Sequence, residues 1–162
     1  MLALPPVPES VMTAAPGTTG STVIPCLRYR KAHVAIDWLC DAFGFRRQAV
    51  YAEGDVVHHA QLVFGGGMVM LGSTDHDTQW GRNMVQPDEV DGRQTQSCCV
   101  VVADADAHYA TAKAAGARIV IDIADQDYGG RGYACLDLEG HLWWFGSYDP
   151  WAKGEAAAEP AA

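Results

Sequence analysis

The chain has 162 residues, of which 49% are apolar and 19% are charged. These values suit one globular domain and exclude two full ones. The formal charge of −9 opposes binding to nucleic acid or to an anionic membrane surface, because both require a basic surface. No apolar run reaches the roughly 18 residues that span a bilayer, and prolines and polar residues interrupt any signal-peptide core near the start. We therefore expect a cytoplasmic protein whose partners are small molecules, with cationic compounds favoured.

The cysteines are odd in number and form no C-x-x-C pair with the spacing of a zinc site. An adjacent pair on a strand points to opposite faces, which disfavours a disulfide between its members. We expect reduced thiols at all five positions: Cys26, Cys40, Cys98, Cys99 and Cys135.

Residues 1–22 and 150–162 are predicted to be disordered tails because they are rich in proline, small residues and charge. Between them, residues 23–73 read as one strand-helix-strand unit. Its helix places apolar residues at Ile36, Leu39, Cys40 and Phe43, and Gly44 ends it. The predicted strands are Val23–Arg30, Arg46–Ala52, His58–Phe64 and Met68–Gly72.

Residues 96–149 repeat this pattern after a polar linker over residues 74–95. An apolar run at Cys98–Val102 precedes a helix that starts at Asp104 and ends near Gly116. Three strands follow, at Arg118–Ile123, Gly132–Asp137 and His141–Ser147. The two helix-ending glycines are 72 residues apart, so the chain contains two divergent copies of one βαβββ unit.

Two long segments resemble the vicinal oxygen chelate superfamily of glyoxalases, extradiol dioxygenases and bleomycin-resistance proteins. They are VIPCLRYRKAHVAIDWLCDAFGF and DADAHYATAKAAGARIVIDIADQDYGGRGYACLDLEGHLWWFG, and the likeness covers about residues 22–149. The stretches YGGRGY and DLEGHLWWFG resemble the PhnB-like or bleomycin-resistance-like branch, although that branch usually has proline where Leu138 stands.

The resemblance implies an α+β fold in which two βαβββ modules form a curled mixed sheet around a cavity, with the helices outside. Metal-using members draw their ligands from the first and fourth strands of each module. The corresponding positions here are Ile24, Met70, Ser97 and Trp144. None is a usual ligand, since divalent ions need oxygen, imidazole or thiolate donors. We therefore expect no metal, no cofactor and no catalytic residue.

Strand alternation predicts which side chains line the cavity, because residues two apart share a face. The opposite face, with Leu27, Tyr29, Val69, Leu71, Val100, Trp143 and Phe145, is expected to pack under the helices. Arg131, in the glycine-rich turn, is a candidate clamp for a carboxylate. The full set of ligand-binding candidates is Cys26, Arg28, Arg30, His59, Gln61, Met68, Met70, Cys99, Arg131 and Trp144.

Thioether and indole surface edged by arginine and imidazole suits a flat ligand with a polar end. The leading hypothesis is a metal-free binding protein of the bleomycin-resistance type, a homodimer that holds an amphipathic or cationic antibiotic-like compound. Two alternatives stay open: a metal-dependent glyoxalase-type lyase or dioxygenase-like enzyme with non-standard ligands such as His59 and Gln61, and a regulatory ligand sensor.

Overall fold

The computed structural model describes residues 20–75 and 77–152, to which all structural statements below refer. Of the two predicted tails, residues 1–19 and 153–162 lie outside this description. Within the described ranges, no helix combines the length and the apolar character needed to cross a membrane.

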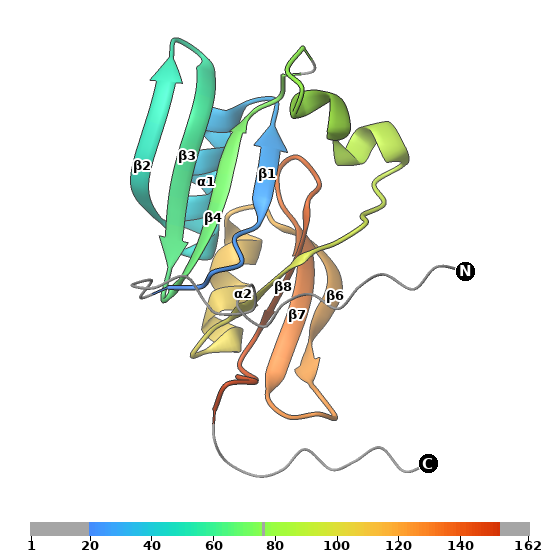
Figure 1. Cartoon of the computed structure of the whole chain (residues 1–162). Coiled ribbons are helices and arrows are strands. Elements are labelled where there is room, and N and C mark those ends of the chain that lie inside the picture. The colour runs from blue at the N-terminus through green and yellow to red at the C-terminus, as the bar shows by residue number, and fades with distance from the viewer. Residues whose placement is uncertain (1–19, 76, 153–162) are drawn as a thin grey trace, which may run out of the picture.

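Two βαβββ modules follow one another along the chain, as predicted (Figure 1). The first comprises β1 (Cys26–Tyr29), α1 (Ala32–Phe43), β2 (Arg46–Glu53), β3 (Val56–Phe64) and β4 (Gly67–Ser73). The second comprises β5 (Cys98–Val101), α2 (Ala105–Ala114), β6 (Arg118–Asp125), β7 (Arg131–Leu136) and β8 (Leu142–Gly146). The α+β fold class expected from the sequence is therefore confirmed.

Each module forms its own four-stranded mixed sheet. The strand orders are β1-β4-β3-β2 and β5-β8-β7-β6, with the first strand of each module parallel to the fourth and the other pairs antiparallel. Strands β1 and β5 are consequently edge strands, and in the described chain they are not hydrogen-bonded to each other.

One face of each sheet packs into a common core, and the faces are those that strand alternation predicts. Tyr29, Trp143 and Phe145 are completely buried, and Val69 and Leu71 nearly so. Leu27 and Val100 pack against this core from partly buried positions. Helices α1 and α2 contact their own sheets on this side and also contact each other, so the opposite sheet faces are left open.

Element ends follow local chemistry. Gly44 adopts a left-handed conformation with φ of 79°, which suits a residue without Cβ, and closes α1. The Asp104 carboxylate caps α2 by accepting from the Ala107 N–H at 2.9 Å. Helix α2 ends at Ala114, and its C-cap residue is Ala115, one residue before the predicted Gly116. Strand β1 begins only at Cys26, immediately after Pro25, which has no N–H to donate.

A hairpin turn over residues 137–141 fastens the second module to the first. At its centre the buried Asp137 carboxylate accepts four hydrogen bonds. Its Oδ2 accepts from the Tyr29 hydroxyl at 2.7 Å and from the Trp143 indole N–H at 3.0 Å. Its Oδ1 accepts from the backbone N–H groups of Glu139 and His141, both at 3.0 Å. One carboxylate thus satisfies buried donors from both modules.

The rest of this turn engages the start of α1. The Glu139 carboxylate accepts from the backbone N–H groups of Arg30 at 2.7 Å and Lys31 at 2.8 Å. Helix α1 receives no side-chain cap from its own N-cap residue, so this negative charge stands where the helix dipole favours it. The His141 Nε2–H donates to the Arg28 carbonyl at 2.8 Å.

We expect Asp137→Asn to lower the free energy of unfolding by about 3 kcal/mol, because the amide nitrogen cannot accept two of the four hydrogen bonds. Chemical denaturation followed by circular dichroism measures this. Asp127→Asn, in an exposed turn, is the matched control and should change stability by less than about 0.5 kcal/mol. Equal stability of the two variants would contradict the role assigned to Asp137.

Candidate functional site

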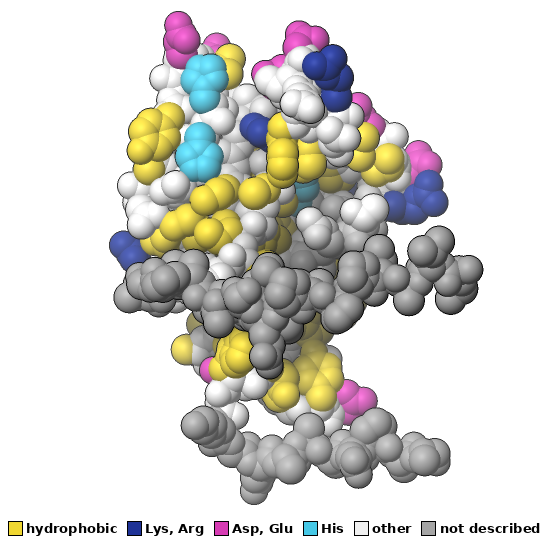
Figure 2. All heavy atoms as spheres, in the orientation of Figure 1, with side chains coloured by type: hydrophobic (Ala, Val, Ile, Leu, Met, Phe, Trp, Pro, Cys, Tyr) yellow, Lys and Arg dark blue, Asp and Glu magenta, His cyan; other side chains and the backbone are white. Residues whose placement is uncertain are grey.

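The open face of the first sheet carries most of the candidate residues. Cys26 pairs with Met70, and Met70 pairs with Gln61, so these three side chains form one row across β1, β4 and β3. Figure 2 shows two histidine side chains and, below them, a band of hydrophobic side chains on this side of the molecule. We call the group the sheet-1 face; its members are Cys26, Arg28, His59, Gln61, Met68 and Met70.

Arg28 lies across its strand partner Gly72. A Cβ atom at Gly72 would collide with Nη1 of the guanidinium, so the absence of a side chain there makes room for it. The same Nη1 donates to the Ser73 carbonyl at 3.3 Å. Arg28 is therefore held flat against the sheet.

Polar groups edge this face beside the apolar row. The nitrogens Gln61 Nε2 and His59 Nε2 lie 3.1 Å apart, and an amide nitrogen is the donor in such a pair. The Tyr51 ring stacks on the His59 ring at 6.2 Å between centroids. Imidazole, amide and guanidinium groups are thus all within the same sheet surface.

The open face of the second sheet is built around Trp144. Its indole lies over two glycines: a Cβ at Gly132 would come within 2.6 Å of the ring and one at Gly146 within 3.0 Å of Nε1. Cys99 and Ala134 are its partners on either side. We call Cys99, Ile121, Ala134 and Trp144 the sheet-2 face. The missing side chains at Gly132 and Gly146 thus make room for a partly buried indole on this sheet face.

The four positions that the resemblance implies as metal-ligand positions do not offer the usual ligands. Ile24, Met70, Ser97 and Trp144 provide no imidazole or carboxylate, and Ile24 and Ser97 lie just before strands β1 and β5. In the part of the chain that the structure describes, no group of three or more His, Cys, Asp or Glu side chains could hold an ion.

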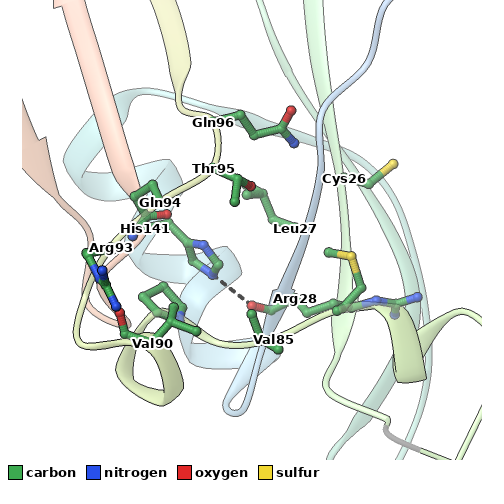
Figure 3. A pocket seen from close by; sticks show the side chains of 12 residues that line it. Cys26, Leu27, Arg28, Val85, Val90, Arg93, Gln94, Thr95, Gln96 and His141 are labelled. Carbon is green, nitrogen blue, oxygen red and sulfur yellow. Dashed lines mark hydrogen bonds between the residues drawn. The ribbon is translucent and has the colours of Figure 1, made fainter.

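Two larger pockets lie where the modules meet. One pocket, of about 430 Å³, lies between β1 and linker residues 84–96. The His141 side chain lines it and points toward the Arg28 carbonyl (Figure 3). The other, of about 500 Å³, lies between residues 23–27 and 96–98, so it includes both Ile24 and Ser97. Trp144 lines neither pocket.

A smaller recess of about 80 Å³ opens on the sheet-1 face. Its wall combines Arg28, His59 and Met70 with Trp80, which comes from the linker. We call it the Arg28 recess. The structure thus brings four residues together that are far apart in the sequence.

The linker contributes site residues that sequence reasoning missed. It contains two short 3-10 helices, Gly81–Asn83 and Pro87–Val90. It also contacts the hairpin turn over residues 137–141, through a hydrogen bond from Gln94 Nε2 to the Gly140 carbonyl at 2.9 Å. The one signal available was a large aromatic residue, Trp80, within an otherwise polar stretch. The residues missed are Trp80, Met84, Gln94, Gln96 and His141.

Two predicted ligand-binding arginines instead contact carboxylates of the chain. Arg30 Nη1 lies 2.8 Å from Asp88 Oδ1. Arg131 binds Asp106 through Nε at 2.9 Å and Nη2 at 3.1 Å, and Asp125 through Nη1 at 2.8 Å. These bonds raise the pKa of the Arg131 guanidinium further above its ordinary value. Both arginines therefore already have partners.

The thiols are free, and burial keeps the inner ones protonated. All five cysteines lack a disulfide. Desolvation, with a contribution from the Asp137 charge, raises the pKa of Cys98 to about 11 and that of Cys135 to about 12. Burial also raises the pKa of Cys99. Thiols held in the neutral form are poor nucleophiles and metal ligands.

Known structures resemble this arrangement. The chain is 37% identical to TioX from Micromonospora sp. ML1, an alignment that covers 78% of this chain and 98% of that one with a TM-score of 0.62. UcmS2, at 11% identity, aligns over 76% of this chain and 95% of its own with a TM-score of 0.61. A glyoxalase/bleomycin resistance protein/dioxygenase from Nocardioides, at 15% identity, covers 91% and 95% with a TM-score of 0.57. The last two similarities concern the fold alone.

No curated protein matches the chain. Residues 22–145 match the sequence model of one family, and this range includes both modules and nearly all of the open sheet faces. The chain belongs to the glyoxalase/bleomycin resistance protein/dioxygenase superfamily.

Proposed function

We propose that this protein is a metal-free small-molecule binding protein of the bleomycin-resistance type, which holds a flat amphipathic compound against its open sheet faces. The observation that supports this proposal is that none of the four positions which the resemblance implies as metal-ligand positions carries a usual ligand; they are Ile24, Met70, Ser97 and Trp144. The Trp144 indole instead packs against Gly132 and Gly146. Methionine sulfur and an indole ring adapt to planar apolar ligands. Antibiotic-like ring systems have this chemistry.

We further propose that the protein acts as a homodimer. The sheet-2 face exposes Ile121 by 53% and the neighbouring Val101 by 40%, and exposed apolar groups of this kind mark interfaces. Each chain has two open faces, one on each module. In a dimer with two-fold symmetry, each copy buries the same surface of the other. We therefore propose that a second copy of the chain covers this surface.

Titration with planar bleomycin-like or mitomycin-like compounds should change the tryptophan fluorescence in a saturable way. Trp144→Ala should weaken binding of the responding compound by about tenfold, the size of one aromatic stacking contact. Trp151→Ala, which removes an indole that is 89% exposed, should leave the affinity unchanged. If no planar compound gives a saturable signal, the proposed function is wrong.

Metal analysis addresses the enzyme alternative. That alternative places a metal on residues such as His59 and Gln61, and residues 20–75 and 77–152 contain no group of three or more His, Cys, Asp or Glu side chains that could hold an ion. Protein purified without chelators should therefore contain well under one equivalent of nickel, zinc, iron or manganese per chain. A stoichiometric content of any of these ions would favour the metal-dependent alternative over the binding function.

Light scattering tests the dimer. We expect the wild-type protein to have twice the mass of one chain and Ile121→Glu to have the mass of one, because a buried unpaired charge opposes association. Val34→Glu is the matched control, since Val34 has a similar exposure of 54% but lies on α1. A monomeric wild-type protein at micromolar concentration, or a dimeric Ile121→Glu variant, would contradict the assignment.

A further inference from the structure

Building on the proposed function, we infer that the ligand carries a carboxylate and that Arg28 binds it in the Arg28 recess. The inference specifies the polar end of the compound whose ring lies on the sheet faces. The net charge of −9 alone would favour a cationic ligand, whereas Arg28 favours an anionic group at this position. Four observations on this recess support it.

Two arginines share this sheet face by strand register, Arg28 on β1 and Arg46 at the start of β2. Arg28 is the one that lines the recess, and its guanidinium has N–H groups without a partner in the described chain. Its Nη1 donates to the Ser73 carbonyl at 3.3 Å, and within the described chain the guanidinium forms no ion pair with a carboxylate. By contrast, Arg30, Arg47 and Arg131 each bind at least one such carboxylate. A half-buried guanidinium without an anionic partner is suited to bidentate binding of a ligand carboxylate.

Two features of strand β4 and its end fix the position of this guanidinium. Because Gly72 has no side chain, Arg28 can lie across β4, where a Cβ would collide with it. The Ser73 carbonyl then anchors one end of the side chain. Holding a long side chain in its binding geometry before the ligand arrives lowers the entropic cost of binding.

No acidic side chain lines the recess within the described ranges. Its lining consists of Cys26, Leu27, Arg28, His58, His59, Met70, Leu71 and Trp80. Glu53 is the carboxylate that reaches this edge, and it lies 3.8 Å from His58 with its side chain 90% exposed. The net negative charge of the chain acts from a distance and is screened over about 8 Å at physiological salt. Arg28 contacts the bound group directly and therefore determines that this group is an anion.

The recess has the size of an end group. Its volume of about 80 Å³ is well below the roughly 300 Å³ at which pockets begin to enclose drug-sized ligands. A carboxylate fits there, while an attached ring has to extend over Met70 and Cys26 or against Trp80. The geometry accordingly describes a flat ring with a carboxylate on its edge.

Calorimetric titration with three ligands that share one ring tests this inference. Naphthalene-2-carboxylate, naphthalene-2-carboxamide and 2-naphthylmethylammonium share the ring and carry an anionic, a neutral and a cationic end group, respectively. We expect the wild-type protein to bind the carboxylate at least about tenfold more tightly than the ammonium compound, as charge-assisted hydrogen bonds imply. Arg28→Gln should weaken carboxylate binding by about ten- to hundredfold and carboxamide binding by much less.

Two further variants control for damage to the fold. Gly72→Ala should displace the guanidinium and selectively weaken carboxylate binding, even though Arg28 is still present. Arg47→Gln removes the same charge on the helix side of the sheet, where Arg47 contacts Asp37, and should leave all three affinities unchanged.

The outcomes separate this inference from the proposed function. Equal binding of all three compounds would overturn the carboxylate preference and leave metal-free binding intact. Unchanged carboxylate affinity in both Arg28→Gln and Gly72→Ala would also overturn it. Binding of none of the three compounds would contradict both proposals.

Discussion

The buried Asp137 carboxylate is the contact on which the arrangement of the two modules depends. It accepts hydrogen bonds from Tyr29 of the first module and Trp143 of the second, both of which are completely buried. Without this carboxylate, the Tyr29 hydroxyl and the Trp143 indole N–H would each lose their hydrogen-bond acceptor inside the core. Losing a buried hydrogen bond in this way lowers the free energy of unfolding more than losing an exposed one. The same turn places Glu139 at the start of α1, so strand β1 and its ligand-facing residues are positioned by the second module.

This mode of docking determines where a ligand can bind. Because the modules meet through their helices, the shared core and the hairpin, the opposite faces of both sheets stay open. Glycines on each face make room for a large side chain: Gly72 for Arg28, and Gly132 and Gly146 for Trp144. The duplicated unit thus has the strands from which related proteins draw metal ligands, but here they carry a guanidinium, a thioether and an indole.

Regular elements could be predicted from the sequence, and the irregular part of the site could not. Period-two alternation correctly assigned Tyr29, Val69 and Trp143 to the core, because only one register buries the apolar face. The linker has no such period, so an aromatic residue in a polar stretch marks Trp80 as unusual but does not place it at the Arg28 recess. The partners of Arg131 lie 25 and 6 residues away on separate elements, and only the folded chain brings them together.

Anomalous scattering from crystals grown with 6-bromonaphthalene-2-carboxylate can show whether a planar ligand lies on an open sheet face without a metal, because the bromine marks the ring. We expect a bromine peak in van der Waals contact with Met70 or Trp144 and no metal peak at these residues. A bromine peak confined to the pockets between β1 and the linker, or a metal ion on a sheet face, would contradict it.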